Sequence, residues 1–253
     1  MDKTVLILSA GGVFGAYQAG VWKALSGWFE PDAVVGASIG SVNGWLIAAG
    51  CPPAELEDLW LHADEVLATR PRMPRHWSHG VLDPRWIEER LESLCGRFSP
   101  RIPLTVVLTQ LSGFRPVLAS APDLNHDHLL ASCAVPGAFN LRRIANRYYA
   151  DGGLMAALPL WAGPAIGATR MIAVNAMPPP PAPIGFVSKA MRRRADSAVA
   201  GSVPTVLIQP SQPLGPYFSM LNYRPEKIRD WIEAGRLDAE QLKHSISECF
   251  ERQ

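Results

Sequence analysis

The sequence predicts an α/β protein with a mainly parallel central sheet, and three observations lead to that fold class. Short apolar runs recur along the chain, and segments with helical spacing of apolar side chains alternate with them. Two of these runs end directly in glycine-rich turns. The chain has 253 residues, of which 48% are hydrophobic and 19% are charged, enough for a sizeable core. We therefore expect a single domain over residues 1–253.

The first two strands and helices follow one another closely. Thr4 to Leu8 is a continuous apolar run that suits a strand buried on both faces, and helical spacing follows from Gly15 to about Phe29. Asp32 to Val35 predicts a second strand, and the small residues from Ser41 to Ala49 predict a second helix. Strands joined by a helix in this way predict a right-handed crossover between parallel strands.

The later segments continue this alternation. Asp83 predicts a helix cap, because Pro84 suits the first helical position. We expect an exposed loop from Arg70 to Gly80 and a stiff proline connector over residues 178–181. The other predicted strands are residues 104–109, 117–120, a strand ending at Ala150, 171–175 and 206–209, and the other predicted helices are residues 53–68, 83–95, 125–133 and most of the chain from Arg224.

Composition and charge exclude several classes of protein. The 24 Lys and Arg nearly balance the 23 Asp and Glu, so the chain lacks the positive field of a dedicated nucleic-acid binder. The four cysteines are widely spaced, which indicates neither a disulfide framework nor a zinc knuckle and favours a cytoplasmic location. His126 and His128 have no further clustered ligands, so we expect no metal site. The apolar runs are too short for a transmembrane helix or a signal peptide.

The strongest motif places a serine between two glycines. Ser38 lies in the segment GASIG, directly after a predicted strand and before a predicted helix. A turn this sharp brings backbones so close that a Cβ at Gly36 or Gly40 would clash. The serine is left strained, with its hydroxyl above the sheet and a helix N-terminus beneath it. This is the pattern of a nucleophile elbow, so Ser38 is the candidate nucleophile.

A second glycine-rich turn, from Gly11 to Gly15, follows the first strand. Glycines there let backbone N–H groups point at an anion beside a helix N-terminus. The segment lacks the full phosphate-binding patterns, so a nucleotide site is the weaker interpretation. Because neighbouring parallel strands end side by side, we expect the N–H groups of Gly11, Gly12 and Val13 to form an oxyanion hole near Ser38. A tight helix-entry turn without function is the alternative.

A serine nucleophile needs a base, and two residues are candidates. Of the six histidines, His244 alone follows at the distance that a Ser-Asp-His order suggests, but a surface position on a terminal helix explains it better. Asp151 follows a predicted strand end and precedes Gly152 and Gly153, which allow a sharp turn. A carboxylate on that rim can accept the serine proton directly, although Asp-Gly is also a common turn sequence.

Three segments together resemble the patatin-like phospholipase family over most of the chain. LSAGGVFGAYQAGVWKAL is similar to the family's glycine-rich opening, GASIGSVNG to its serine elbow, and ASCAVPGAFNLRRIANRYYADGGLMAALPL to the segment with its Asp-Gly-Gly/Ala motif. The elbow comes earlier than in ordinary α/β-hydrolases. The resemblance implies a three-layer fold and an acyl hydrolase acting on lipid esters. It also implies a dyad of Ser38 and Asp151, with no catalytic histidine, metal or organic cofactor.

Two positions depart from the family's pattern. Ala10 stands where the first of three glycines is usual, which requires a negative φ. Phe14 stands where the family commonly carries Arg or Lys, and implies either more neutral substrates or a packed side chain in place of an ion-pairing one. We favour the packed side chain. A non-catalytic lipid-binding protein and a Ser-His-Asp esterase using His244 stay open as alternatives.

Two basic segments are candidates for peripheral contact with an anionic membrane. Lys189 and Arg192 to Arg194 form a basic stripe beside apolar residues, although a solvated helix face explains the stripe better. The loop from Arg70 to His79 combines arginines with Trp77 and is also a candidate lid over the acyl site.

Overall fold

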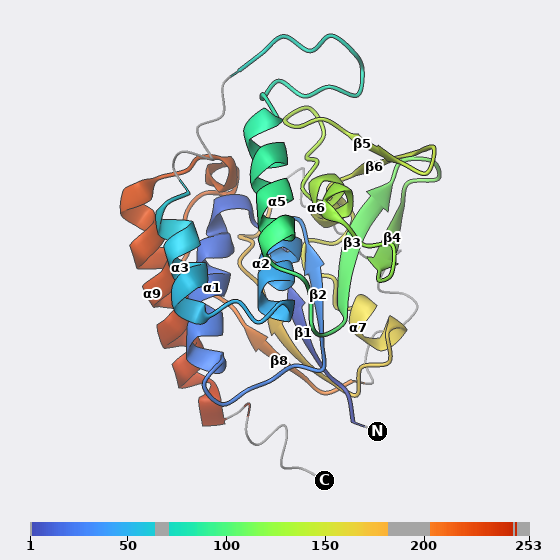
Figure 1. Ribbon diagram of the computed structural model, residues 1–253. Coiled ribbons are helices and arrows are strands. Elements are labelled where there is room, and N and C mark those ends of the chain that lie inside the picture. Colours follow the sequence, from blue (N-terminus) through green and yellow to red (C-terminus); the bar gives the residue numbers. More distant parts are fainter. Residues whose placement is uncertain (1, 64–70, 182–202, 245, 247–253) are drawn as a thin grey trace.

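The computed structural model describes residues 2–63, 71–181, 203–244 and 246, and a mixed, mostly parallel sheet lies at its centre (Figure 1). The strand order is β5-β6-β3-β2-β1-β7-β8, and β4 pairs with β3. The strands are β1 (Thr4–Leu8), β2 (Ala33–Ala37), β3 (Leu104–Gln110), β4 (Arg115–Ser120), β5 (Arg142–Ile144), β6 (Arg147–Ala150), β7 (Arg170–Val174) and β8 (Thr205–Ile208). The run from β3 through β2, β1 and β7 to β8 is parallel, which confirms the predicted α/β class.

The central strands are buried on both faces because alternate side chains enter two separate cores. Leu6 and Leu8 of β1 pack in the larger core, and Val5 and Ile7 pack in the smaller one on the other face. The pairing of β1 with β2 aligns Leu8 with Gly36, so both strands end at the same edge of the sheet. That edge carries the two glycine-rich turns.

Helices cover both faces of the sheet and complete three layers (Figure 1). Most helices lie over the larger core, while α7 and the chain around it cover the smaller one. The α-helices are α1 (Gly15–Leu25), α2 (Ile39–Ala48), α3 (Pro53–Leu61), α5 (Arg85–Arg97), α6 (His126–Ser132), α7 (Ala162–Ala165) and α9 (Pro225–Gln241). Short 3-10 helices are η1 (Gly12–Phe14), η2 (Gly152–Leu154) and η3 (Tyr217–Leu221).

Two predicted helix ends were wrong. The first helix ends at Leu25 rather than near Phe29, and Ser26 is its cap residue. The helix predicted to reach residue 68 ends at Leu61, and residues 64–70 lie outside the described part of the chain. Apolar spacing continues past both ends, so periodicity alone could not locate them.

The start of α5 also differs from the prediction. Pro84 occupies the cap position rather than the first helical position, and the helix begins at Arg85. Asp83 still serves this end of the helix, because its Oδ1 accepts a hydrogen bond from the Arg85 N–H at 3.2 Å. The short elements β5 and η3 were not predicted, since segments of three to five residues carry too little periodicity.

Helices α1 and α9 cross with their backbones in contact. A Cβ built at Gly20 would lie 1.8 Å from the carbonyl oxygen of Ile232, and one at Gly235 would lie 2.1 Å from that of Tyr17. The Tyr17 hydroxyl also donates a buried hydrogen bond of 3.0 Å to Asp238. Glycine at both positions is therefore required for this crossing, through which α9 fixes α1 and the loop that precedes it.

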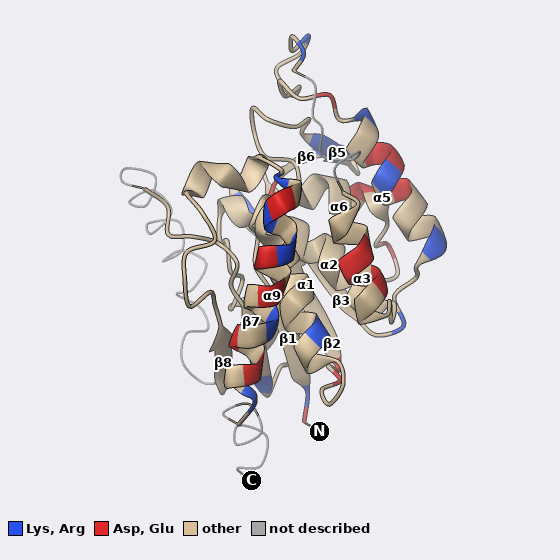
Figure 2. Ribbon diagram, turned by 90° about the vertical axis from the view of Figure 1, so that its left-hand side faces the viewer, with Lys and Arg blue, Asp and Glu red and all other residues tan. Residues whose placement is uncertain are grey.

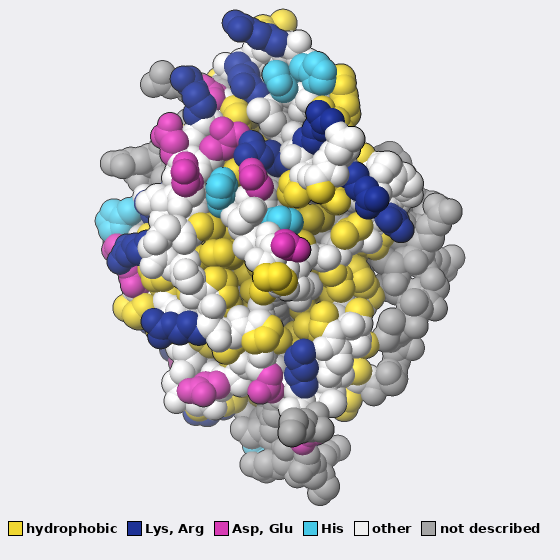
Figure 3. All heavy atoms as spheres, turned by 45° about the vertical axis from the view of Figure 1, so that its right-hand side comes forward, with side chains coloured by type: hydrophobic (Ala, Val, Ile, Leu, Met, Phe, Trp, Pro, Cys, Tyr) yellow, Lys and Arg dark blue, Asp and Glu magenta, His cyan; other side chains and the backbone are white. Residues whose placement is uncertain are grey.

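Charged residues recur along α9, α3 and α5 (Figure 2). Figure 3 turns the β3–β4 side of the molecule forward and shows hydrophobic side chains across the middle of that face. Lys189 and Arg192 to Arg194, the predicted basic stripe, lie outside the described residues. Within the described chain, no helix combines the length and apolar character needed to span a bilayer.

Candidate active site

Ser38 lies on the strained turn between β2 and α2. Its φ of 54° and ψ of −127° fall in a region that non-glycine residues rarely adopt. A Cβ at Gly36 would lie 2.3 Å from the carbonyl oxygen of Gly40, and one at Gly40 would lie 2.5 Å from that of Ser9. The predicted steric reason for both glycines is confirmed, and the turn has the geometry of a nucleophile elbow.

Hydrogen bonds hold both sides of the strained residue. The Ser38 N–H donates to the Oγ of Ser132 at 2.8 Å, and the Ser132 hydroxyl donates in turn to the carbonyl of Val107 in β3 at 2.8 Å. The Ser41 hydroxyl donates to the Ser38 carbonyl at 2.6 Å. Ser132 is fully buried at the end of α6, so it ties the elbow to β3.

Asp151 follows β6 and is anchored to its surroundings through its backbone. Its N–H donates to the Ala134 carbonyl at 2.9 Å, and its carbonyl accepts a hydrogen bond of 2.8 Å from the Thr109 hydroxyl. The Gly153 N–H donates to the carboxylate Oδ1 at 2.7 Å. A Cβ at Gly152 would lie 2.1 Å from the Val107 carbonyl oxygen, so this glycine is needed for the loop to approach β3.

The carboxyl group of Asp151 is buried and electrostatically coupled to Ser38. Burial raises its pKa from 3.8 to about 6, while hydrogen bonding from the Ser38 side chain and the Gly153 N–H opposes that rise. Its Oδ2 is buried and has no partner at ordinary hydrogen-bond geometry within the described residues. Ser38 thus lies near a buried carboxyl group whose second oxygen has no hydrogen-bond partner in the described part of the chain.

Cys133 lies beside both of these residues and was missed from the sequence. Burial and the charge of Asp151 raise the pKa of its thiol far above the ordinary range, although contacts with the hydroxyls of Ser38 and Ser41 act in the opposite direction. The thiol is therefore neutral and lies against the turn that carries Ser38. Ser132 and Cys133 both fall in the ASCAVPG segment, which carried a signal only through its family resemblance.

The glycine-rich loop after β1 forms the short helix η1 next to the elbow. Gly12 has a φ of +55°, and a Cβ there would lie 2.0 Å from the backbone oxygen of Met220 in η3. The Phe14 N–H closes the turn on Gly11 at 3.1 Å. Among the described residues, the preceding N–H groups of Gly11, Gly12 and Val13 donate no hydrogen bond. Their role as an oxyanion hole stays a prediction.

A buried polar network connects this loop to the elbow helix. The Gln18 side chain donates to the Ser9 carbonyl at 2.7 Å. The amide nitrogen of Asn43 donates to the Gln18 side-chain oxygen and to the Gly15 carbonyl, both at 2.9 Å. The network joins the end of β1, the start of α1 and the middle of α2. This network was not predicted from the sequence, although Gln18, a lone polar residue within an apolar helical segment, was an available signal.

The two family departures are accommodated without strain. Ala10 does not have a positive φ. Phe14 is fully buried, and its ring meets that of Trp231 edge-on at 5.0 Å between centroids. Phe14 is thus a packed side chain, as the favoured interpretation predicts.

The histidine alternative finds little geometric support. His244 is exposed and comes just after α9, whose carboxyl end lies at the opposite edge of the molecule from the elbow (Figure 1). Within the described residues, no three His, Cys, Asp or Glu side chains gather in a way that could hold a metal ion.

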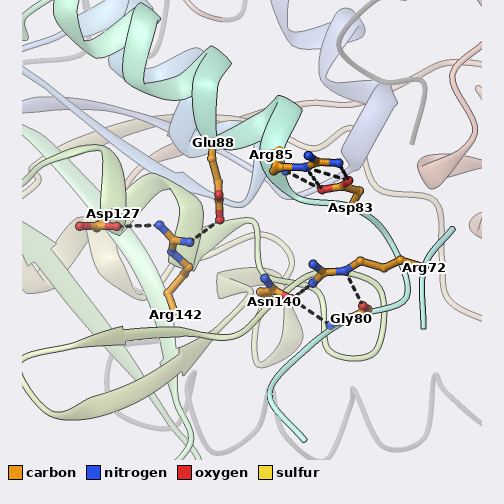
Figure 4. A network of polar contacts seen from close by, with 8 residues as sticks. All are labelled: Arg72, Gly80, Asp83, Arg85, Glu88, Asp127, Asn140 and Arg142. Atoms are coloured by element: carbon orange, nitrogen blue, oxygen red, sulfur yellow. Dashed lines mark hydrogen bonds and ion pairs between the residues drawn. The ribbon is translucent and has the colours of Figure 1, made fainter. Parts of the chain in front are cut away.

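Ion pairs fix α6, which carries Ser132 at its end. The guanidinium of Arg142 in β5 bonds Glu88 of α5 at 2.6 Å and Asp127 of α6 at 2.8 Å (Figure 4). This bridge is partly exposed, so its main effect is on the position of α6 rather than on stability.

The predicted exposed loop is attached to the same region. Arg72 hydrogen-bonds the side chain of Asn140, whose oxygen also accepts the Gly80 N–H at 3.1 Å (Figure 4). Met73 is 86% exposed and Trp77 is 65% exposed, which confirms the predicted exposure for the middle of this segment. Its end differs from the prediction, because Ser78 and Gly80 are buried. Arg70 lies outside the described residues.

The fold and the two turns define a class of protein: a three-layer α/β protein with a serine on a strained strand-to-helix turn and a buried carboxylate beside it. A family model described as patatin-like phospholipase matches residues 6–163, more than half of the chain. The protein belongs to the patatin-like phospholipase family. The match includes Ser38, Asp151 and both glycine-rich turns.

Curated relatives and a solved structure are also similar to the chain. The chain is 28% identical over 181 residues to uncharacterized NTE family proteins of Mycobacterium bovis and Mycobacterium tuberculosis, a match that covers 68% of this chain and 49% of each relative. The chain thus spans about half the length of these curated relatives. VipD from Legionella pneumophila has a similar fold, with a TM-score of 0.54 at 13% identity over 96% of this chain and 67% of VipD.

Proposed function

We propose that the protein is a serine acyl hydrolase that cleaves carboxylic ester bonds of lipids with a dyad of Ser38 and Asp151. One observation carries the proposal: a serine on a strained turn lies beside a buried carboxyl group whose Oδ2 has no partner among the described residues. Membership of the patatin-like phospholipase family supports lipid esters as the substrate class.

In the proposed reaction, Asp151 accepts the proton of the Ser38 hydroxyl while Oγ attacks the carbonyl carbon of the ester. The resulting oxyanion is bound by the N–H groups of Gly11, Gly12 and Val13. Collapse of the tetrahedral intermediate transfers the proton from Asp151 to the leaving alcohol and leaves an acyl group on Ser38. Water then gives a proton to Asp151 and attacks this acyl ester, and the fatty acid leaves as Ser38 recovers its proton.

The electrostatics of Asp151 suit a general base at neutral pH. A base is most effective when its pKa lies just below the working pH, because it is then ionised and still strongly basic. Burial raises the pKa of Asp151 to about 6, which meets both conditions. No histidine is needed in this scheme.

The proposal places the protein in the cytoplasm, with peripheral contact to the membrane that supplies its substrate. The exposed side chains of Met73 and Trp77, beside Arg75, support such a contact. Buried Phe14 contributes no cation to the site, so esters without an anionic head group fall within the proposed range.

The test combines an ester-hydrolysis assay with labelling by a fluorophosphonate, which reacts with activated serines. Ser38→Ala and Asp151→Ala are expected to lower p-nitrophenyl ester hydrolysis by several orders of magnitude, and Ser38→Ala is expected to abolish labelling. Ser26→Ala and Asp230→Ala, which replace the same residue types away from the site, are matched controls.

His244→Ala distinguishes the competing base, since the dyad requires that activity be unchanged. Hydrolysis that persists in folded Ser38→Ala protein would refute the proposal. A wild-type protein that binds lipid but neither labels nor hydrolyses esters would identify a non-catalytic member of the family instead.

A further inference from the structure

A cavity of about 700 Å³ lies at the carboxyl ends of β7 and β8. Its walls come from the segments that follow Asp151, β7 and β8, together with Tyr217 of η3. Its volume is typical of sites that enclose small molecules, about 300–1,000 Å³. Among the described residues that line it, none is Lys, Arg, Asp or Glu, and proline and aliphatic side chains predominate. Such a lining suits an uncharged, apolar ligand.

The cavity adjoins the candidate base on one side. Gly153 lines it, and the N–H of this residue donates to Asp151 Oδ1 at 2.7 Å. Tyr217 lines it as well, and the charge of Asp151 contributes to raising the pKa of its phenol, so the two side chains lie within electrostatic reach. A ligand in the cavity would therefore end beside the carboxylate.

The cavity also adjoins the glycine-rich loop. The carbonyl of Ala157 accepts the Ala10 N–H at 2.8 Å, and both Ala157 and Ala176 line the cavity. A Cβ built at Gly11 would lie 3.5 Å from the Cβ of Ala176, so wall and loop are in contact. The cavity wall thus contacts the glycine-rich loop and includes the residue that hydrogen-bonds Asp151, so it lies next to both groups that flank the reacting carbonyl in the proposed reaction.

We propose that this cavity holds the acyl chain of the substrate and selects uncharged chains of medium or greater length. The inference rests on the proposed function, because it assumes an ester positioned at Ser38. A methylene moved from water into an apolar site gains enough free energy to raise kcat/KM by up to about fourfold. The value of kcat/KM should therefore rise with each added methylene until the acyl chain reaches the end of the cavity.

The experiment uses variants with a narrowed cavity and measures kcat/KM for four esters: p-nitrophenyl acetate, butyrate, octanoate and decanoate. Gln209 lines the cavity and is exposed, so Gln209→Trp adds bulk there without disturbing the core. Gln212 is exposed in the same segment but does not line the cavity, which makes Gln212→Trp the matched control. Met177→Trp narrows the cavity from the β7 side as a second variant.

We expect kcat/KM to rise from acetate to octanoate in the wild-type protein. Gln209→Trp and Met177→Trp should each lower the decanoate-to-acetate ratio at least tenfold, and Gln212→Trp should leave it within about twofold. Equal ratios in all four proteins, with hydrolysis still dependent on Ser38, would overturn the cavity assignment and leave the proposed function standing.

A binding measurement separates the two proposals further. Ser38→Ala protein should bind uncleaved p-nitrophenyl decanoate in equilibrium dialysis, and adding Gln209→Trp should weaken that binding at least fivefold. Binding unaffected by Gln209→Trp and by Met177→Trp would refute the cavity assignment even if no ester were hydrolysed. Loss of hydrolysis with retained, cavity-dependent binding would instead contradict only the proposed catalysis.

Discussion

Replacing Asp151 with asparagine should abolish hydrolysis and should make the protein more stable relative to wild type as the pH rises from 5 to 8. Burial raises the pKa of this carboxyl from 3.8 in the unfolded chain to about 6 in the folded protein. A raised pKa means that the folded state binds the proton more tightly, so the associated stability is present below pH 3.8 and is lost as the pH rises through 6. At pH 8 the buried charge therefore costs about 3 kcal/mol relative to the protonated form.

Asparagine removes that charge and retains an oxygen for the Gly153 N–H, which Asp151 Oδ1 accepts at 2.7 Å. The amide nitrogen of the asparagine takes the place of Oδ2, which has no regular hydrogen-bond partner among the described residues. Burying this unsatisfied donor lowers the free energy of unfolding by about 1–3 kcal/mol at every pH. The informative quantity is therefore the change of the Asp151→Asn stability difference with pH. About half of the 3 kcal/mol should already appear between pH 8 and pH 5.

The assay is urea unfolding of wild-type and Asp151→Asn protein at pH 8 and pH 5, followed by the fluorescence of the eight tryptophans. The variant should gain about 1–2 kcal/mol relative to wild type on going from pH 5 to pH 8. Asp230→Asn, at an exposed position of α9, is the matched control and should show no such gain. A stability difference that is the same at both pH values would refute the argument that burial dominates this carboxyl.

Three further predictions concern the same site. Because Asp151 must be ionised to accept a proton, kcat/KM for a neutral ester should rise with pH and reach half its maximum near pH 6; a profile already flat at pH 5 would contradict this. Ser132→Ala leaves the buried Ser38 N–H without its acceptor, and should lower the free energy of unfolding by about 1–3 kcal/mol and slow fluorophosphonate labelling, with Ser26→Ala as control. Phe14→Lys restores the residue type common in the family, but it places an ammonium group in a buried site beside Trp231. It should therefore lower the free energy of unfolding by at least about 3 kcal/mol in urea titrations. An unchanged unfolding midpoint would show that the Phe14 ring contributes little to stability.

The features that could be predicted from the sequence are those with a local cause. The elbow around Ser38 was predictable because two glycines, a preceding apolar run and a following helix lie within one short segment. The parallel sheet was predictable because strands buried on both faces have continuous apolar runs. From the residues alone, Asp151 could be either the proton acceptor or a turn residue, since an Asp-Gly pair is also a common turn. The family resemblance was needed to favour the proton acceptor.

The features that could not be predicted depend on contacts between distant segments. Nothing near Ser132 in the sequence indicates that its hydroxyl accepts the Ser38 N–H. Gln18 and Asn43 meet because α1 and α2 pack together, which periodicity does not specify. The domain boundary over residues 1–253 stays a prediction, because the family match ends at residue 163. The role of His244 also stays open to the test proposed above.

The close crossing of α1 and α9 at Gly20 and Gly235 bears on how the protein is synthesised. Helix α1 directly follows the glycine-rich loop, yet the segment that covers it, α9, is among the last described parts of the chain to leave the ribosome. The nascent chain therefore exposes one side of α1 until α9 has been translated, and an uncovered helix face of this kind favours aggregation. In the proposed hydrolase, the glycine-rich loop before α1 would therefore gain its support from α9 only once that helix has been made, so chains cut short before α9 are expected to be inactive.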